Sequence, residues 1–288
     1  MMVTESAQTR ATIDLHTHTN ASDGLDAPAE LVANASQRGI SVLGVTDHDT
    51  MDGLDAASEA AAQAGITLVP GVELSTTVDR AEVHVLGYFV DSTESDLRAR
   101  LSDLAASRVR RVERMIVRLH ELGYRVDGEA ILAQAEEGSI GRPHVARALM
   151  EIGAVDSVND AFERFLKAGR PAYIPRDPFS PEDAVGLLVR YSAIPVLAHP
   201  FSTKDIEGTL ARLVPAGLKG LETYYAEYSS EQHAQLHAIA DGWGLVPTGG
   251  SDYHGLGFRE GRELGAAPVP QDAWERLSTL YADLAGGA

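Results

Sequence analysis

The 288-residue sequence contains no cysteine. This absence excludes disulfides, thiolate zinc sites, iron–sulfur clusters and cysteine nucleophiles. The sequence also lacks any apolar run near the roughly 18 residues that a membrane-spanning helix needs. Segment 1–10 is polar and has no apolar core of a signal peptide. We therefore expect a cytoplasmic protein with no membrane partner, in which residues 1–10 form a disordered tail.

Basic residues are scarce. The chain has 24 Lys and Arg against 42 Asp and Glu, a formal charge of −18. Such a surface repels nucleic-acid backbones and anionic membranes at long range, so we expect no duplex nucleic acid as a partner. An anionic substrate would have to be held by local cations, either Arg and Lys side chains or metal ions.

Short apolar runs alternate with helical patterns near both ends of the chain. Strands are predicted at Ala11–His16, Ser41–Thr46, Ile66–Val69, Glu82–Val90, Ile194–Ala198, Lys219–Glu222 and Leu245–Thr248. This rhythm indicates βα units and a mostly parallel sheet. Between them, apolar residues such as Leu97, Leu101 and Leu104 recur at helical spacing. We predict an α/β barrel-like domain in two pieces, 11–95 and 191–288, with a mostly helical insert at 96–190.

Histidines and carboxylates gather at the predicted strand ends. Six of the ten histidines lie there or inside a strand: His16, His18, His48, His84, His199 and His254. Carboxylates accompany them: Asp14, Asp23, Asp47, Asp49, Glu73 and Asp252, with Glu73 expected just after the third strand. The carboxyl ends of barrel strands meet at one face, and alternate residues of an extended segment project to the same side, as in His16-Thr-His18.

These donor groups suit Zn, Mn or Fe. A single buried histidine is more often a hydrogen-bonded core residue than a ligand. That explanation would have to apply to all six histidines independently, so the pattern favours a metal centre.

Seven short motifs together resemble the PHP (polymerase and histidinol phosphatase) family. They are Asp14-Leu-His-Thr-His18, Ser22-Asp-Gly24, Thr46-Asp-His-Asp49, Gly71-Val-Glu73, Val83-His-Val85, Ala198-His-Pro200 and Gly250-Ser-Asp-Tyr-His254. They span residues 12–256 in the family's order, with Thr19 where the family usually has Ser. The resemblance implies a distorted (β/α)7 barrel and a centre of three divalent metal ions.

By motif position, the resemblance also implies a ligand set for each ion. The first metal would take His16, His18, Glu73 and Asp252. The second would take Glu73, His84 and His199, with Glu73 bridging. The third would take Asp23, His48 and His254. We expect Mn²⁺, with Zn²⁺ or Fe as alternatives.

Motifs in the insert resemble one subgroup of the family. They are Gly141-Arg-Pro-His144-Val-Ala-Arg147, Ala161-Phe162 and Gly169-Arg-Pro-Ala-Tyr173. The subgroup includes nucleoside 3′,5′-bisphosphate phosphatases and 5′-end RNA-trimming enzymes. Pro143 at the first helical position would put Arg142 at a helix N-terminus, which favours anions. We expect Arg142, His144 and Arg170 to contact substrate; the alternative is that Arg142 packs locally and His144 lies on the surface.

Other residues carry weaker signals. Arg108, Arg110, Arg111 and Arg114 are expected to pair with nearby acids, and the alternative is that they face phosphate. Glu222 is expected to support a ligand rather than bind metal. His233 and His237 have a zinc-binding spacing without the metalloprotease glutamate, and a solvent-facing helix is expected. Phe162, Phe165 and Tyr173 would either stack on a base or form the insert's core.

The expected reaction is hydrolysis of a phosphomonoester of a small nucleotide, a nucleoside 3′,5′-bisphosphate or a mononucleotide such as AMP. A hydroxide bridging two metals would attack phosphorus, with Glu73, His199 and Asp252 as catalytic residues. Asp49, His144 or a metal-bound water would protonate the leaving group. The alternatives are a histidinol phosphatase, a 5′-to-3′ exonuclease on short RNA or DNA oligonucleotides, and a non-catalytic metal-binding module.

Overall fold

Seven strands form one sheet in chain order. The computed structural model describes residues 13–286 except 79–80 and 137, so the predicted tail at 1–10 lies outside the described residues. The strands are β1 (Ile13–Asp14), β2 (Val42–Val45), β3 (Thr67–Val78), β4 (Ala81–Tyr88), β5 (Ile194–Leu197), β6 (Gly220–Tyr225) and β7 (Val246–Gly250). Each of the seven predicted strands has a counterpart here.

The sheet nearly closes into a barrel, because β7 and the segment after it bond to the segment after β1. The Leu15 N–H donates to the Gly249 carbonyl at 3.1 Å, and the His18 N–H donates to Tyr253 at 2.8 Å. Strand β4 is antiparallel to both β3 and β5, whereas the other pairs are parallel. The predicted distorted seven-stranded barrel is confirmed, and the reversed β4 is part of its distortion.

Strand β3 is longer than expected, and Glu73 lies inside it rather than after it. The predicted strand ends at Val69, just before Pro70 and Gly71, a dipeptide that is typical of turns. In the structure, Gly71–Val78 instead pairs with β4 along its whole length. This long hairpin carries Glu73 and His84 to the barrel interior on adjacent strands.

Helices cover the outside of the barrel. They are α1 (Pro28–Gln37), α2 (Leu54–Ala64), α7 (Pro181–Arg190), α8 (Ile206–Ala216), α9 (Ser230–Trp243) and α10 (Gln271–Gly286), with a short 3₁₀ turn η3 (Pro200–Ser202) after β5. Local signals fix their ends: Ser229 and Gln232 form a reciprocal capping box on α9, and Gly244 ends it in the left-handed conformation.

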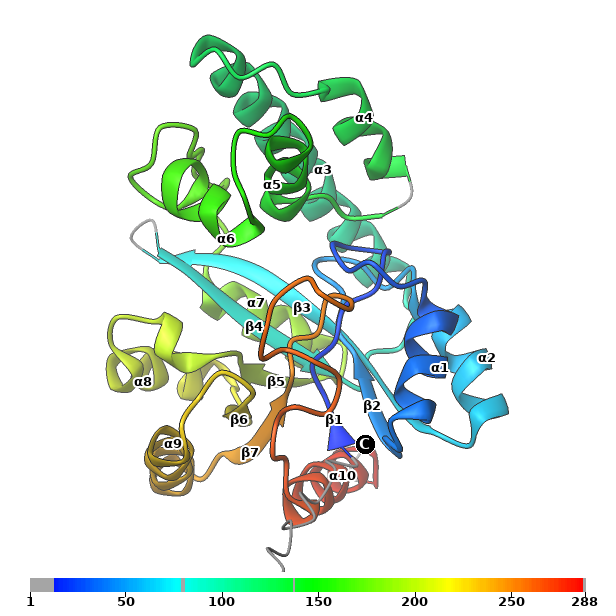
Figure 1. Ribbon diagram of the computed structural model, residues 1–288. Coiled ribbons are helices and arrows are strands. Elements are labelled where there is room, and N and C mark those ends of the chain that lie inside the picture. Colours follow the sequence, from blue (N-terminus) through cyan, green and yellow to red (C-terminus); the bar gives the residue numbers. More distant parts are fainter. Residues whose placement is uncertain (1–12, 79–80, 137, 287–288) are drawn as a thin grey trace, which may run out of the picture.

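The insert stacks over one end of the barrel, opposite α10 (Figure 1). It contains α3 (Ser95–Glu121), α4 (Gly128–Ala133), η1 (Gln134–Glu136), α5 (Arg142–Glu151), α6 (Val158–Ala161) and the π-helical η2 (Phe162–Leu166). A separate apolar core fills it, including Met115, Leu149 and Phe165. None of the described helices is long and apolar enough to cross a membrane.

The ends of the insert stay a prediction. Helix α7 buries Val185 and Leu188 in the same core as barrel strands β3 and β5. Helix α3 begins in that core at Leu97 and Leu101 and ends in the core of the insert. This packing favours assigning α7, which the predicted 96–190 division includes in the insert, to the barrel.

Candidate metal centre and substrate cavity

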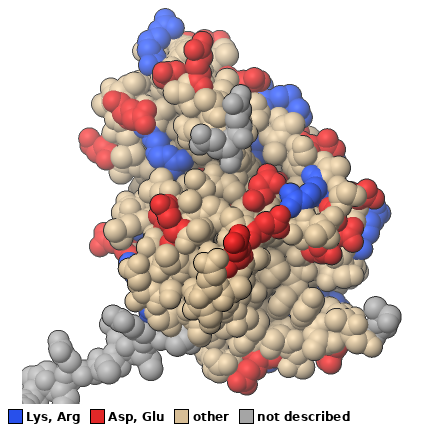
Figure 2. Space-filling view, turned by 90° about the vertical axis from the view of Figure 1, so that its right-hand side faces the viewer, with Lys and Arg blue, Asp and Glu red and all other residues tan. Residues whose placement is uncertain are grey.

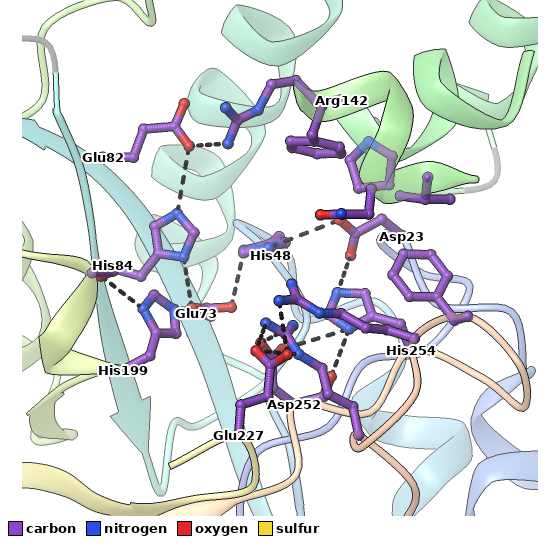
Figure 3. Close-up of a pocket in the computed structure, with 18 of the residues that line it drawn as sticks. Asp23, His48, Glu73, Glu82, His84, Arg142, His199, Glu227, Asp252 and His254 are labelled. Atoms are coloured by element: carbon purple, nitrogen blue, oxygen red, sulfur yellow. Dashed lines mark hydrogen bonds and ion pairs between the residues drawn. The ribbon is translucent and has the colours of Figure 1, made fainter. Parts of the chain in front are cut away.

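The nine predicted metal ligands meet at the end of the barrel that faces the insert. Figure 3 shows those that line the cavity: Asp23, His48, Glu73, His84, His199, Asp252 and His254. They come from both edges of the nearly closed sheet and from its middle: His16, His18 and Asp23 after β1, His48 after β2, Glu73 in β3, His84 in β4, His199 after β5, and Asp252 and His254 after β7. Barrel closure therefore joins motifs that lie more than 230 residues apart in the chain.

Glu73 lies at the centre of this cluster and is 1% exposed. Five imidazole nitrogens lie 2.8–3.3 Å from its oxygens, those of His16, His18 and His48 around Oε2 and those of His84 and His199 around Oε1. Burial opposes ionisation of this carboxyl, but the neighbouring imidazoles outweigh burial and hold its pKa well below the usual range. An ionised carboxylate with five imidazoles around it is suited to bridging cations.

Three groups of donor atoms each fall within 4.8 Å. They are His16, His18, Glu73 and Asp252; His18, Asp23, His48 and His254; and His48, Glu73 and His84. The first coincides with the ligand set expected for the first metal, and the second adds His18 to the set expected for the third. The third contains Glu73 and His84 of the set expected for the second metal, with His48 in place of His199. His199 belongs to none of the three groups, but its Nε2 lies 3.1 Å from Glu73 Oε1, the oxygen that also faces His84.

The donor chemistry fits divalent cations. Nε2 of His16 and Nε2 of His18 face each other at 3.2 Å, and the buried His18 Nδ1 and His84 Nε2 have no hydrogen-bond partner among the described residues. Imidazole and carboxylate donors suit borderline divalent metals. Burial disfavours a charged His18, yet Asp252 and Glu73 raise its pKa to about 10. Protons and metal ions therefore compete for this cluster.

Glu222 contacts two of the histidines, as expected for a residue that supports ligands. The predicted strand ends at Glu222, whereas β6 continues to Tyr225 and Glu222 lies inside it. Its Oε1 lies 2.8 Å from His16 Nδ1, and its Oε2 accepts the His199 N–H at 2.6 Å. A carboxylate on the far nitrogen fixes the tautomer of His16 and leaves Nε2 free for a metal.

Backbone strain concentrates in the site. Asp49, His199 and Asp252 have φ angles of 54°, 26° and 53°. Such angles are unfavourable for residues with a side chain and persist only where the surroundings hold them. Here the Asp49 N–H donates to Glu73 at 3.0 Å and the Asp252 N–H to His16 at 2.8 Å. The barrel thus holds these residues in directions that a relaxed loop would not adopt.

A cavity of about 970 Å³ lies between the cluster and the insert. Six basic residues line it: Arg108, Arg142, Lys167, Arg176, Arg259 and Arg262. Six acidic residues line it as well, namely Asp23, Glu73, Glu82, Glu227, Asp252 and Glu260. On the face in Figure 2, acidic and basic side chains are interspersed. The cavity therefore balances its own charge within a chain of −18, and divalent ions would make it cationic.

Of the three expected substrate contacts, the structure brings only Arg142 to the cavity. Arg142 starts α5, pairs with Glu82, and lies over the Phe162 ring at 5.0 Å. His144 is 4% exposed and does not line the cavity. Its Nδ1 accepts the Gly141 N–H at 3.1 Å, which caps α5, so neither the substrate contact nor the surface position describes it. Arg170 is exposed and does not line the cavity either.

The expected pairing of the arginines on α3 is confirmed. Arg108 pairs with Asp49 and Arg111 with Glu82, while Arg110 and Arg114 both reach Asp177 at 3.5 Å. Asp49 is also bound by the Ser75 N–H and does not line the cavity. Neither Asp49 nor His144 lines the cavity, and the proton donor for the leaving group stays a prediction.

Sequence reasoning missed Glu82, Arg176, Tyr225 and Arg262. Glu82 holds Arg111, Arg142 and Arg176, and these cations outweigh its burial and keep its pKa well below the usual range. Glu82 lies two residues before His84, so both side chains project from the same face of β4. This spacing could have identified Glu82 in the sequence. The two arginines lie in irregular segments, where no spacing predicts them.

The buried position of His144 predicts a pH dependence of stability. Burial, aided by the positive charge of Arg147, lowers its pKa from 6.5 to about 4. Between pH 6.5 and pH 4, His144 is therefore protonated in the unfolded chain but neutral in the folded chain. The free energy of unfolding falls as the pH drops through this range. Between pH 7.5 and pH 5 this one group removes roughly 2 kcal/mol.

We expect His144→Asn, whose amide oxygen can still accept the Gly141 N–H, to lose less stability over this range than the unmodified chain. Urea unfolding of the metal-free proteins at both pH values measures the difference. His237→Asn is the matched control, because His237 is a partly exposed residue that pairs with Asp241. An equal pH dependence for the His144→Asn and unmodified proteins would contradict the assignment.

The family model described as PHP domain matches residues 14–169, which is 156 of the 288 residues. This chain belongs to the PHP family. A 3′,5′-nucleoside bisphosphate phosphatase of Chromobacterium violaceum is 34% identical over 277 residues, 93% of this chain and 96% of that protein. A 5′-3′ exoribonuclease of Haemophilus influenzae is 32% identical over 92% of this chain and 98% of that protein.

The fold comparison agrees with the family. The structure of a Bifidobacterium adolescentis protein described as a metal-dependent phosphoesterase has a TM-score of 0.85 at 30% identity. The match covers 93% of this chain and 95% of the Bifidobacterium adolescentis chain. The resemblance found in the motifs is thus confirmed, and the chain is a PHP-family metal-dependent phosphoesterase.

Proposed function

We propose that this protein removes one phosphate from a nucleoside 3′,5′-bisphosphate. The observation that carries the proposal is the cavity itself. Seven of the nine proposed metal ligands line it, and Arg142 and Arg176, which lie in the segment predicted as the insert, line it as well. Figure 3 shows Arg142 across the cavity from the ligands. A substrate with two phosphates could therefore place one at the metal centre and the other at the arginines.

The nine residues of the cluster would hold three divalent ions, and we expect Mn²⁺. When bound, such ions supply Lewis-acid polarisation of the phosphoryl group and make water acidic enough to attack near neutral pH. Glu73, His199 and Asp252 are the proposed catalytic residues, because they line the cavity and present two carboxylates and one imidazole to it. Glu222 would hold His16 through its ring and His199 through its backbone N–H in the positions that metal binding requires.

Charge balance supports a second phosphate near Glu82. Arg111, Arg142 and Arg176 surround this carboxylate, and Arg108 and Arg176 also pair with Asp49. Four guanidinium charges therefore face two carboxylates. Two positive charges remain, which matches a phosphate dianion. Guanidinium groups bind phosphate oxygens through paired N–H donors.

A nucleobase would have one aromatic wall in this cavity. Phe162 lines it next to Ser157 and Asn159. Phe165, by contrast, is 5% exposed and belongs to the insert's core. Phe162 is therefore the residue among the expected aromatics that could stack on a base.

The proposal is tested by phosphate release from the Mn²⁺-loaded protein. Adenosine 3′,5′-bisphosphate, AMP and histidinol phosphate are compared at equal concentration. We expect the bisphosphate to be preferred at least about tenfold, since charge-assisted contacts contribute about 1.5–3 kcal/mol. A preference for histidinol phosphate would refute the nucleotide assignment. No release from any of them would refute the bisphosphate assignment and favour the oligonucleotide candidate, and a non-catalytic metal-binding module only if oligonucleotides are also unchanged.

A second candidate is 5′-to-3′ trimming of short RNA oligonucleotides. The cavity of about 970 Å³ lies at the upper end of the usual range for small-molecule pockets, roughly 300–1,000 Å³, and the Haemophilus influenzae relative is an exoribonuclease. Stepwise release of mononucleotides from a 5′-phosphorylated RNA oligomer would support it. An unchanged oligomer, under conditions in which the bisphosphate is hydrolysed, would remove it.

A further inference from the structure

We propose that Arg262 and Tyr225 are positioning residues that restrict Asp252 to binding metal through one oxygen. The inference rests on the proposed metal centre, but not on the identity of its substrate. Neither residue belongs to the motifs that supply the nine proposed ligands.

The two oxygens of Asp252 have different surroundings. The Tyr225 hydroxyl donates to Oδ2 at 2.7 Å, and Nη1 of Arg262 donates to the same oxygen. Oδ1 faces the cluster instead, 3.2 Å from His18 Nε2 and 3.5 Å from His16 Nε2.

A carboxylate oxygen accepts about two hydrogen bonds in the carboxyl plane. Oδ2 is therefore fully engaged by its two donors, and Oδ1 alone remains for a cation. Asp252 also has the strained φ of 53°, so its side chain needs contacts on its outer side to keep this direction.

The two donors support each other. Tyr225 ends β6, whereas Arg262 comes from the irregular segment after β7, and its guanidinium lies over the Tyr225 ring at 5.3 Å. Gly261, with a φ of +87°, gives the turn that directs Arg262 inward.

Glu227 anchors the guanidinium of Arg262. Its Oε2 accepts from Nη2 at 2.8 Å and from Nε at 3.2 Å. Arg262 therefore bridges two carboxylates with its planar fork, which a lysine cannot do. The pair with Glu227 also offsets the positive charge that Arg262 would otherwise present to a metal ion.

Two substitutions test the proposal, Tyr225→Phe and Arg262→Met. We expect each to raise the free Mn²⁺ concentration at half-occupancy by about 10- to 100-fold, the usual effect of losing a partner of a metal ligand. Equilibrium dialysis with elemental analysis measures it without substrate. The Mn²⁺ electron paramagnetic resonance spectrum should also change, because Asp252 is freed to bind through both oxygens. Arg262→Lys should restore only part of the affinity.

Tyr228→Phe and Arg212→Met are the matched controls. Tyr228 lies in the same cavity wall and accepts the Phe201 N–H, and Arg212 on α8 is exposed and pairs with Glu182 outside the cavity. Neither hydroxyl nor guanidinium binds Asp252 in the described structure, and both substitutions should leave Mn²⁺ affinity unchanged.

Circular dichroism and thermal unfolding of the metal-free variants separate misfolding from lost positioning, and Tyr225→Phe keeps the ring if Arg262→Met fails to fold. Unchanged or tighter Mn²⁺ binding in folded Tyr225→Phe and Arg262→Met would overturn the proposal. So would a change confined to the KM for substrate, because Arg262 would then be a substrate contact. If Mn²⁺ affinity falls as expected but no nucleotide is hydrolysed, this inference stands and the proposed substrate fails.

Discussion

Replacing Glu73 by Gln is expected to lower kcat for phosphate release by at least about 10³-fold, since metal polarisation contributes several kcal/mol to such reactions. Glu73 has five imidazoles around it, two of them on Oε1 and three on Oε2. An amide of the same shape cannot carry the negative charge that a bridging position requires. Its NH₂ group would also face imidazole nitrogens that should bind metal.

The measurement is kcat at saturating bisphosphate together with bound Mn²⁺ per chain. We expect the Glu73→Gln protein to lose metal equivalents as well as rate. Glu59→Gln, an exposed substitution on α2, is the control and should retain both. A Glu73→Gln protein with full metal content and more than a tenth of the original kcat would contradict the bridging role.

Replacing Arg142 by Met is expected to lower kcat/KM for adenosine 3′,5′-bisphosphate by roughly 10- to 150-fold, the equivalent of charged hydrogen bonds of about 1.5–3 kcal/mol. The same variant should change kcat/KM for a simple aryl phosphate less than about threefold, because that ester has no second phosphate to bind. Glu82 keeps Arg111 and Arg176 after the substitution, so no buried carboxylate is left unpaired.

Arg114→Met is the matched control for Arg142→Met. Arg114 is an arginine of the insert that is exposed and pairs with Asp177 outside the cavity. It should leave both substrates unaffected. If Arg142→Met lowers kcat/KM equally for the bisphosphate and the aryl ester, Arg142 does not bind a second phosphate, and its contribution lies in holding the insert on Glu82.

The fold class and the ligand cluster could be predicted from the chain because both depend on local spacing. His16 and His18 lie two apart in an extended segment, and Asp252 and His254 repeat that spacing after β7. Strand and helix patterns of a βα barrel bring such strand ends to one face whatever the loops do. A wrong strand boundary, as at Glu73, therefore did not change which residues meet.

The residues around the cluster could not be predicted in the same way. Arg176 and Arg262 lie in irregular segments before α7 and after β7, and His144 looks the same in sequence whether it faces substrate or caps a helix. Arg170, quoted beside a subgroup motif, is exposed and outside the cavity. Their positions depend on how the insert and loops pack across the barrel end.

The barrel, the helical insert and the cluster of candidate metal donors follow from short segments with a regular spacing, which the amino-acid sequence encodes directly. Which cations face the cavity, the pairing of Glu82 with three arginines, and the contacts of Arg262 and Tyr225 with one oxygen of Asp252 depend on the tertiary structure. The physical reason is that ion pairs and hydrogen bonds between distant segments form only after closure of the barrel has fixed the distances between them.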